Sequence, residues 1–353
     1  MNQKTIVQMI TGLGGGGAEQ MVLKLGLEAK KSRVNTLVVP ISNINTIEQK
    51  FIDAEVPYYF LGITSIFSIF RGLKRLKQKL SSLNGVVLHC HMFHALVIGI
   101  LFVLFFRKVP IVFTLHNNAV QQKYRAFILR ISKGLRNADI LFSKTGSQKY
   151  LKNTLIIPNG LDIANFQLPK GIREKDLPVE IFHFLFLGSL TEQKNPLSLV
   201  DFVTDLNNRG ITNFVIDVVG DGPYRSLLET KVIENGYVDS IKLHGFSDKA
   251  LEFIKTSNCL IMPSFWEGMP VVILEAGASR LPIISTPVGS IPDVVSETHG
   301  YLVDLNEFSA SMISVIENYA EALDKSNRFY DHVVNNYSIE EVFKKHLKLY
   351  NAV

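Results

Sequence analysis

The stretch Pro263-Ser264-Phe265-Trp266-Glu267-Gly268-Met269-Pro270-Val271-Val272-Ile273-Leu274-Glu275-Ala276 decides the fold of the second half of this chain. The apolar run 259–262 before it predicts a buried strand, which ends at Pro263 because proline has no backbone N–H to donate. Proline fits the first turn of a helix, so we expect the chain to continue as a helix that begins near Met269-Pro270. A strand followed by a short loop and a helix is the repeating unit of a parallel α/β sheet.

The start of this predicted helix is a candidate anion site. Backbone N–H groups at a helix start attract negative charge, so the turn of Gly268, Met269, Pro270 and Val271 is expected to hold a phosphate. Glu267 precedes the helix, and Glu275 lies about two turns further on. Carboxylates beside a phosphate are repelled by it unless they bind neighbouring hydroxyl groups. A sugar beside Glu267 and a ribose beside Glu275 meet that need.

The spacing Glu-x7-Glu on a strand-loop-helix, followed by Arg280-Leu281-Pro282-Ile283-Ile284-Ser285-Thr286, resembles the retaining glycosyltransferases of family 4, which have the GT-B fold. Further matches cover nearly all 353 residues: Gly16-Gly17-Ala18-Glu19, Ile157-Pro158-Asn159-Gly160-Leu161-Asp162, Gly220-Asp221-Gly222-Pro223 and His244-Gly245-Phe246. The resemblance implies an α/β chain with two Rossmann-like, doubly wound parallel-sheet domains that face a central cleft.

The resemblance also divides the chain. Residues 1–165 are expected to form an N-terminal acceptor-binding domain, and residues 166–335 a C-terminal domain that binds the nucleotide sugar. Residues 336–353 are expected to form a helix that crosses back to the first domain. The charged stretch 168–180 fits the linker, and a hydrophobic content of 47% is ample for two cores.

A glycine-rich loop, residues 12–17, follows the first predicted strand, 5–10. Glycines let the backbone approach a ligand closely, and a helix start favours phosphate. The loop does not open a dinucleotide fingerprint, because the next strand is followed by Ser42 and Asn43 rather than an acid. The resemblance places Gly16 and Gly17 near the donor diphosphate, and we assign Gly14 and Gly15 to the acceptor side. A flexible turn is the alternative.

Histidines cluster where predicted strands of the first half end. Strands at 36–40, 86–89 and 111–115 predict a parallel sheet with helices on both faces, and ligands bind at the carboxyl ends of such strands. His89, Cys90, His91 and His94 follow one strand, but their spacing matches no common zinc pattern. His116-Asn117-Asn118 follow another. The resemblance places His116 beside the transferred sugar, with His91 on the acceptor side; a structural histidine is the alternative for His116.

The second half carries the expected donor contacts. The predicted strand 182–187 leads to Gly188-Ser189-Leu190, where the family shows Gly-Arg-Leu followed by a lysine, and Lys194 is present. The arginine and the lysine hold the donor diphosphate, so Ser189 removes one bidentate phosphate partner. Donor affinity is then lower, or another basic residue substitutes. The family seats the base against the backbone of His244, Gly245 and Phe246.

The chemistry implied by the resemblance is sugar transfer with retention, in which the leaving phosphate assists deprotonation of the acceptor. We assign catalytic roles to His116, Glu267 and Lys194. Glu267 is expected to bind sugar hydroxyl groups, and Glu275 the ribose diol. No Asp-x-Asp sequence occurs, so we expect no metal, and no cofactor beyond a nucleotide-sugar co-substrate, a UDP-sugar.

Charge is divided unequally between the halves. Residues 1–165 hold 21 Lys and Arg against 7 Asp and Glu, a net charge of +14; residues 166–353 hold 16 against 25, a net charge of −9. A basic half indicates an anionic partner. No zinc, RNP-like or helix-turn-helix motif accompanies it, which favours an anionic membrane surface over nucleic acid.

Two segments bear on membranes. Residues 67–80 hold five basic residues, no acids and an apolar stripe, which fits an interfacial amphipathic helix or a surface helix packed on the core. The apolar run 95–106 is too short to span a bilayer and predicts a buried helix. Two cysteines in apolar surroundings and a polar start without a visible signal peptide predict a cytoplasmic protein.

We therefore expect a hexosyltransferase-type enzyme on the inner face of the membrane, acting on a lipid-diphosphate-linked glycan in bacterial surface polysaccharide synthesis. A nucleotide-sugar epimerase of the same fold and a non-catalytic nucleotide-sugar-binding partner are the alternatives. The sugar, the linkage and the oligomeric state are not encoded in any motif found.

Overall fold

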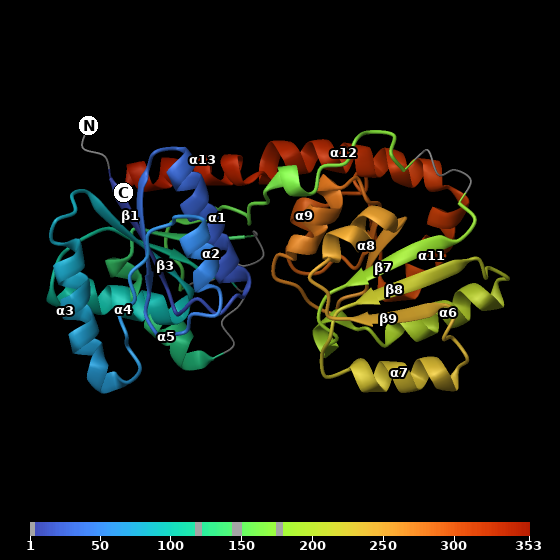
Figure 1. Cartoon of the computed structure of the whole chain (residues 1–353), viewed down its shortest axis with the longest axis horizontal. Coiled ribbons are helices and arrows are strands. Elements are labelled where there is room, and N and C mark those ends of the chain that lie inside the picture. Colours follow the sequence, from blue (N-terminus) through green and yellow to red (C-terminus); the bar gives the residue numbers. More distant parts are fainter. Residues whose placement is uncertain (1–3, 117–121, 143–149, 174–178) are drawn as a thin grey trace. The chain divides into compact units, whose positions relative to one another are not determined.

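The computed structural model describes residues 4–116, 122–142, 150–173 and 179–353 (Figure 1). The chain divides into two compact units: unit 1 is Met1–Gly160 with Ile339–Val353, and unit 2 is Leu161–Ser338. These boundaries lie five and three residues from those predicted at 165 and 335. Of the predicted linker 168–180, residues 174–178 lie outside the described residues. Each unit is described here by itself.

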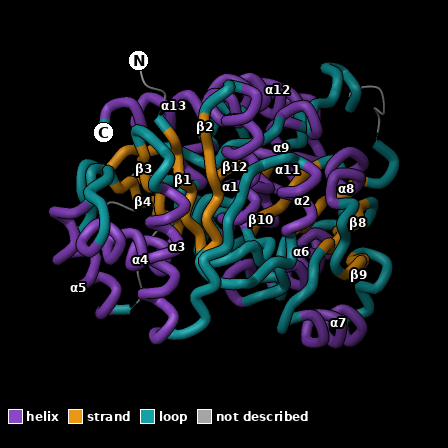
Figure 2. Tube along the Cα trace, turned by 60° about the vertical axis from the view of Figure 1, so that its left-hand side comes forward, coloured by secondary structure: helices purple, strands orange, loops and turns teal. Residues whose placement is uncertain are grey.

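Unit 1 contains a six-stranded parallel sheet in the order β2-β1-β3-β4-β5-β6. Its neighbouring strands β2, β1 and β3 can be followed in Figure 2. All residues of β1 and β3 are buried, as expected for a parallel sheet with both faces covered. The bounds of the strands are β1 (Thr5–Ile10), β2 (Asn35–Pro40), β3 (Val86–His91), β4 (Ile111–Thr114), β5 (Ala138–Leu141) and β6 (Thr154–Ile156).

Helices cover both faces of this sheet. One face packs Val7 and Leu88 against α3 and α4, and the other packs Ile6 and Val87 against α1 and α13. Consecutive strand residues point to opposite faces, so each strand serves both cores. The helices are α1 (Gly17–Lys31), α2 (Glu48–Asp53), α3 (Ile69–Leu80), α4 (Met92–Phe105), α5 (Lys123–Ile131) and α13 (Ile339–Ala352).

Unit 2 contains a second six-stranded parallel sheet, in the order β12-β11-β10-β7-β8-β9. Aromatic packing dominates its core, where the rings of Phe202 and Phe308 stack 4.7 Å apart. The strands are β7 (Phe182–Leu187), β8 (Phe214–Val219), β9 (Ile241–Gly245), β10 (Cys259–Met262), β11 (Ile283–Ser285) and β12 (Tyr301–Leu302). The helices are α6 (Ser198–Asn208), α7 (Arg225–Glu234), α8 (Ala250–Thr256), α9 (Val271–Ala278), α10 (Ile291–Val294), α11 (Phe308–Glu317) and α12 (Tyr319–Tyr337).

The basic segment 67–80 is divided between core and surface. Leu73, Leu76 and Leu80 of α3 are buried against the sheet, which confirms core packing for most of the apolar stripe. Phe67 and Phe70, in contrast, are 93% and 55% exposed. Helix α4 buries most of the run 95–106 between Ala95 and Phe102, as predicted, whereas Leu104 and Phe105 at its end are exposed. Among the described residues, no helix is both long and apolar enough to cross a bilayer.

Candidate functional site

The Glu267 loop, residues 263–270, joins β10 to α9 at the carboxyl end of the unit 2 sheet. Pro270 is the N-cap residue, in an extended conformation, so α9 begins at Val271 rather than at the predicted Met269-Pro270. Four hydrogen bonds tie the loop to the segments on either side of it. They are Phe265 N to Gln193 O (2.8 Å), Asn195 Nδ2 to Pro263 O (3.2 Å), Thr286 Oγ1 to Ser264 O (2.6 Å) and Ser290 Oγ to Gly268 O (2.5 Å).

A glycine in the neighbouring loop allows this close packing. Gly289 has φ +61°, a conformation that side chains disfavour. A Cβ atom there would lie 2.0 Å from the carbonyl oxygen of Glu267. Residue 289 therefore has to be glycine for the Glu267 loop to keep its position.

Glu267 and Lys194, predicted for the sugar and the diphosphate, form one ion pair. Lys194 Nζ lies 2.6 Å from Glu267 Oε1. The same oxygen accepts a hydrogen bond of 2.8 Å from Ser264 Oγ, and Oε2 accepts one of 3.3 Å from Gln193 Nε2. Glu267 is only 7% exposed, so its carboxylate is held in one orientation. Sequence reasoning missed Gln193 and Ser264, although both are polar neighbours of predicted site residues.

The loops after β7, β8 and β9 are joined by backbone hydrogen bonds. Leu190 N donates to Asp221 O (2.9 Å), and Gly220 N donates to Gly245 O (2.8 Å). Gly220 has φ +148°, and a Cβ atom there would lie 1.9 Å from Gly188 O. Ser189 is exposed on the first of these loops, where the family's arginine is expected. The backbone at this edge is thus fixed, while the position of residue 189 is open to solvent.

The side chain of His244 points to a different partner from the one expected of the segment. His244 Nε2 lies 2.7 Å from Asp217 Oδ1, and His183 Nδ1 lies 2.8 Å from Asp217 Oδ2. The role expected of residues 244–246 rests on their backbone, so this pairing of the His244 side chain does not bear on it. Phe246 is 82% exposed, and Glu275 lies half-buried within α9.

In unit 1, the glycine-rich loop leads directly into α1. Gly16 is the N-cap residue and Gly17 begins the helix, and both are exposed together with Gly14. Gly15 has φ +94°. The loop is anchored by Leu13 N, which donates to Ile44 O at 2.8 Å. An anchored, exposed glycine backbone at the carboxyl end of β1 fits the predicted ligand-facing turn.

The structure brings His91 and His116 together. His91 ends β3, His116 follows β4, and His91 Nδ1 lies 3.1 Å from His116 Nε2. Burial lowers the pKa of His116 to about 4 and the pKa of His91 well below its usual range, so both rings are neutral near pH 7. Asn117 and Asn118 lie outside the described residues.

Cys90 and the neighbouring histidines do not share one site. Cys90 faces α4, where its Sγ lies 2.7 Å from the position of a Cβ atom built on Gly99. His89 and His91 point to the opposite face of the strand, and His94 is exposed at the start of α4. The arrangement follows from the two-residue period of the strand.

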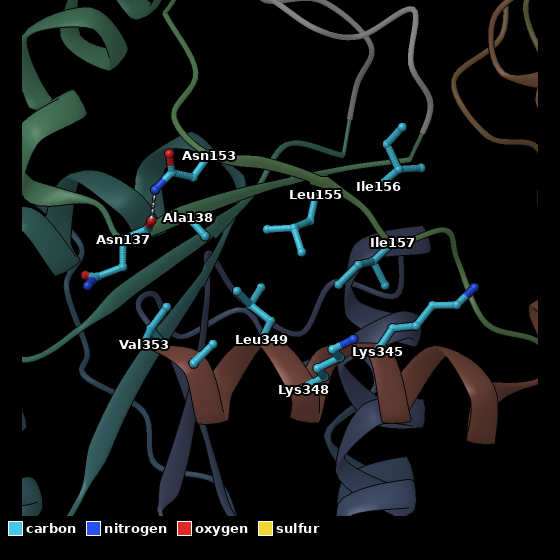
Figure 3. A pocket seen from close by; sticks show the side chains of 11 residues that line it. Asn137, Ala138, Asn153, Leu155, Ile156, Ile157, Lys345, Lys348, Leu349 and Val353 are labelled. Atoms are coloured by element: carbon cyan, nitrogen blue, oxygen red, sulfur yellow. Dashed lines mark hydrogen bonds between the residues drawn. The ribbon is translucent and has the colours of Figure 1, made fainter.

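A pocket of about 640 Å³ lies elsewhere in unit 1, between the edge strand β6 and α13 (Figure 3). Leu155, Ile157 and Leu349 line it, and Lys345 and Lys348 extend from α13 beside it. Asn153 Nδ2 donates to Asn137 O at 3.2 Å at one end. None of the predicted site residues lines this pocket.

Comparison with known protein sequences identifies relatives for part of the chain. Residues 170–331 match the family model described as glycosyl transferases group 1. UDP-Gal:alpha-D-GlcNAc-diphosphoundecaprenol alpha-1,3-galactosyltransferase of Escherichia coli is 30% identical over 207 residues, which cover 55% of this chain and 53% of the relative. The amylovoran biosynthesis glycosyltransferase AmsD of Erwinia amylovora is 30% identical over 186 residues, 49% of this chain and 50% of the relative. The chain spans about half the length of these curated relatives.

Solved structures extend the similarity to the whole chain. A glycosyltransferase from Rickettsia africae superimposes with a TM-score of 0.84 at 17% identity, over 100% of this chain and 99% of the other. Anabaena HepE in complex with UDP-glucose gives a TM-score of 0.81 at 16% identity, over 99% and 100%. The two doubly wound parallel sheets are those of the GT-B fold, which confirms the predicted fold class.

Proposed function

We propose that this chain moves a sugar, with retention, from a UDP-sugar to a glycan on a lipid diphosphate. The reaction belongs to bacterial surface polysaccharide synthesis. Residues 170–331 match the family model described as glycosyl transferases group 1. The observation that carries the proposal is the anchored pair of Lys194 and Glu267 at the carboxyl end of the unit 2 sheet. Ligands of open α/β sheets bind at that end.

The pair suits a charged leaving group next to a sugar. An ammonium group has three N–H donors, and Glu267 takes one of those of Lys194. The others are available to a diphosphate oxygen, where negative charge grows as the anomeric bond breaks. The fixed carboxylate of Glu267 is assigned to the sugar hydroxyl groups. Glu275 in α9 is assigned to the ribose, and the backbone of 244–246 to the base.

Unit 1 supplies the other half of the proposed chemistry. The exposed backbone at Gly16 and Gly17 is assigned to the donor diphosphate, with Gly14, Gly15 and His91 on the acceptor side. His116 is assigned to the sugar near its reacting carbon. Because the ammonium group of Lys194 and the start of α9 supply positive charge within unit 2, we propose transfer without a bound metal.

The relatives support the choice of donor and acceptor class. The name of the Escherichia coli relative specifies UDP-Gal and a diphosphoundecaprenol-linked sugar, and the Anabaena neighbour was solved with UDP-glucose. A lipid-linked acceptor requires an enzyme that reaches a membrane surface. We therefore propose that the chain binds the inner face of the membrane peripherally.

The surface of unit 1 offers a suitable patch, which we call the α3–α4 tip: Ile66, Phe67, Phe70, Leu104 and Phe105, all more than half exposed. The ring of Phe70 lies 5.7 Å from that of Phe106, so the start of α3 adjoins the end of α4. Helix α3 carries five exposed basic residues, Arg71, Lys74, Arg75, Lys77 and Lys79, of which Lys74 Nζ lies 5.0 Å from the centre of the Phe70 ring. Exposed aromatic groups next to basic ones favour an anionic lipid interface.

A transfer assay tests the proposal. The native chain is incubated with a panel of UDP-sugars and a short glycan on a polyprenyl diphosphate, and NMR reports the anomeric configuration of the product. We expect one sugar to be transferred with retention, and Glu267→Gln to lower kcat about 100-fold. Glu192→Gln, an exposed carboxylate near Lys194, is the matched control and keeps native activity. Interconversion of the sugar without transfer, or donor binding without turnover, would refute the assignment.

A further inference from the structure

Buried polar side chains form a hydrogen-bonded chain that ends at His116. Gln8, in β1, is 1% exposed, and its Oε1 lies 2.6 Å from His91 Nε2. His91 Nδ1 in turn lies 3.1 Å from His116 Nε2. Gln8 lies in β1 and His91 ends β3, while His116 lies two residues beyond the end of β4. The three strands are neighbours in the sheet. The chain lies wholly within unit 1.

These hydrogen bonds all point the same way, from donor to acceptor. An amide oxygen only accepts hydrogen bonds, so His91 carries its proton on Nε2 and accepts at Nδ1. His116 must then donate from Nε2, which leaves the lone pair on its Nδ1. Among the described residues, His116 Nδ1 has no hydrogen-bond partner. Because burial keeps both rings neutral, each ring has one protonated and one unprotonated nitrogen.

The last helix reaches this group of buried residues through Tyr350 of α13. Burial raises the pKa of its phenol, so the hydroxyl group stays protonated. Tyr350 Oη then lies 2.7 Å from His89 Nδ1, and His89 Nε2 lies 2.6 Å from Thr114 Oγ1.

The backbone also holds His91 in place. Met92, the next residue, has φ +72°, in the left-handed region that non-glycine residues rarely adopt. The chain turns there from β3 into α4 with no intervening loop. Strained residues of this kind persist where the surrounding structure holds them and are common at functional sites.

We propose that His91, with its tautomer set by Gln8, is a positioning residue that holds His116 in one ring orientation with Nε2 protonated. In that state His116 Nδ1 accepts a hydrogen bond from a substrate hydroxyl group. The proposal rests on the proposed function, in which His116 contacts the sugar. It assigns His91 a role through His116 rather than a contact of its own with the acceptor.

The tautomer can be measured without any activity. The full chain is labelled with 15N-histidine, and long-range proton–nitrogen NMR spectra assign the protonated nitrogen of each ring. We expect His116 to carry its proton on Nε2 in the native protein and in Thr114→Val, which breaks only the His89 bond at the other end of the network. A proton on His116 Nδ1 in the native protein would overturn the proposal, whatever the enzyme does.

Two variants of the same shape separate hydrogen bonding from packing. His91→Asn keeps an acceptor close to the position of Nδ1, and His91→Leu introduces a side chain with the same number and branching of heavy atoms but no acceptor. We expect His91→Leu to lower kcat roughly tenfold to a hundredfold and to give a mixture of His116 tautomers. His91→Asn should keep most of the native kcat and mostly the native tautomer. The KM for the donor should stay within about twofold, since His91 contacts none of the residues assigned to the nucleotide.

Equal losses in the two His91 variants would mean that packing alone matters and would overturn the proposal. A shifted tautomer with unchanged kcat would also overturn it, because His116 would then not act on the substrate. If the native chain transfers no sugar at all, the proposed function fails, and the NMR result still decides whether His91 and Gln8 set the His116 tautomer.

Discussion

Lys194 Nζ lies 2.6 Å from Glu267 Oε1, across 73 residues of sequence. The side chain of Glu267 is 4% exposed and that of Lys194 is 17% exposed, so the pair is largely shielded from water. One ammonium group therefore has two tasks: it keeps a buried carboxylate charged and oriented, and it offers its remaining donors to a ligand. The proposed donor site depends on both.

Removing either partner is expected to have unequal effects. Lys194→Met leaves a buried carboxylate without its cation, which should lower the free energy of unfolding of unit 2 by about 3–5 kcal/mol. Glu267→Gln should lower the free energy of unfolding by less, because the ammonium group of Lys194 still reaches solvent. The double variant should recover part of the loss of Lys194→Met. Urea unfolding followed by fluorescence of Trp266, the single tryptophan, measures all four proteins; additive effects would contradict the pairing.

The close contact at Gly289 predicts a large effect of a single methyl group. Gly289→Ala places a Cβ atom 2.0 Å from Glu267 O, so the loop must move. Gly236→Ala is the matched control, because Gly236 has φ +72° and nothing within 4 Å of the same position. The control should lose only about 1 kcal/mol of stability, from its backbone conformation. Gly289→Ala should lose clearly more and bind the donor more weakly. Equal losses in thermal unfolding would contradict the prediction.

Much of this architecture could be predicted from the sequence, because a short run of apolar residues is enough to indicate a buried strand. The strands at 5–10, 182–187 and 259–262 were predicted to the residue, and the last helix, expected within 336–353, spans Ile339–Ala352. The Glu267 loop and its helix were found from proline and glycine alone.

The partners inside the site could not be predicted, because they depend on contacts between distant strands. No local pattern pairs Asp217 with both His183 and His244, or Gln8 with His91. The segment 67–80 shows the same limit: its period is that of a helix, but only packing decides that Leu73 is buried while Phe67 is exposed.

Unit 1 is expected to lose stability in acid. Burial lowers the pKa of His116 and of His346 to about 4, whereas an unfolded histidine titrates near pH 6.5. Between these values the unfolded chain binds more protons than the folded one, so the free energy of unfolding falls as pH drops from about 6.5 to 4. The stabilisation is complete above pH 6.5 and amounts to roughly 3 kcal/mol per histidine.

The two units allow an internal control for this pH dependence. Trp266 reports on unit 2, whose shifted histidines, His299 and His332, are only partly buried, while circular dichroism reports on both units. Between pH 7 and pH 5, we expect the urea midpoint of a transition seen by circular dichroism to fall. It should fall further than the urea midpoint seen by Trp266 fluorescence. His346→Leu should reduce that difference. Identical shifts for both signals would show that the buried histidines of unit 1 are not responsible.

Membrane binding through the α3–α4 tip predicts a specific pair of variants. Phe67→Ser and Phe70→Ser should each weaken binding to vesicles of phosphatidylcholine and phosphatidylglycerol about tenfold or less, since each removes one exposed aromatic side chain. Ile233→Ser, at an equally exposed apolar position of α7, is the control and should have no effect. Co-sedimentation at low and high salt measures binding. Equal binding of all variants would place the membrane contact elsewhere.

The central claim is that unit 2 binds a nucleotide sugar through the Glu267 loop and α9 without a metal. Isothermal titration calorimetry of UDP-sugars in EDTA tests it, comparing the native chain with Glu275→Ala, which removes the carboxylate assigned to the ribose. We predict that one UDP-sugar binds in EDTA and that Glu275→Ala weakens its binding about tenfold or more, as expected for a lost hydrogen bond to a charged group. Binding that requires a divalent cation, or no binding of any UDP-sugar, would contradict the account.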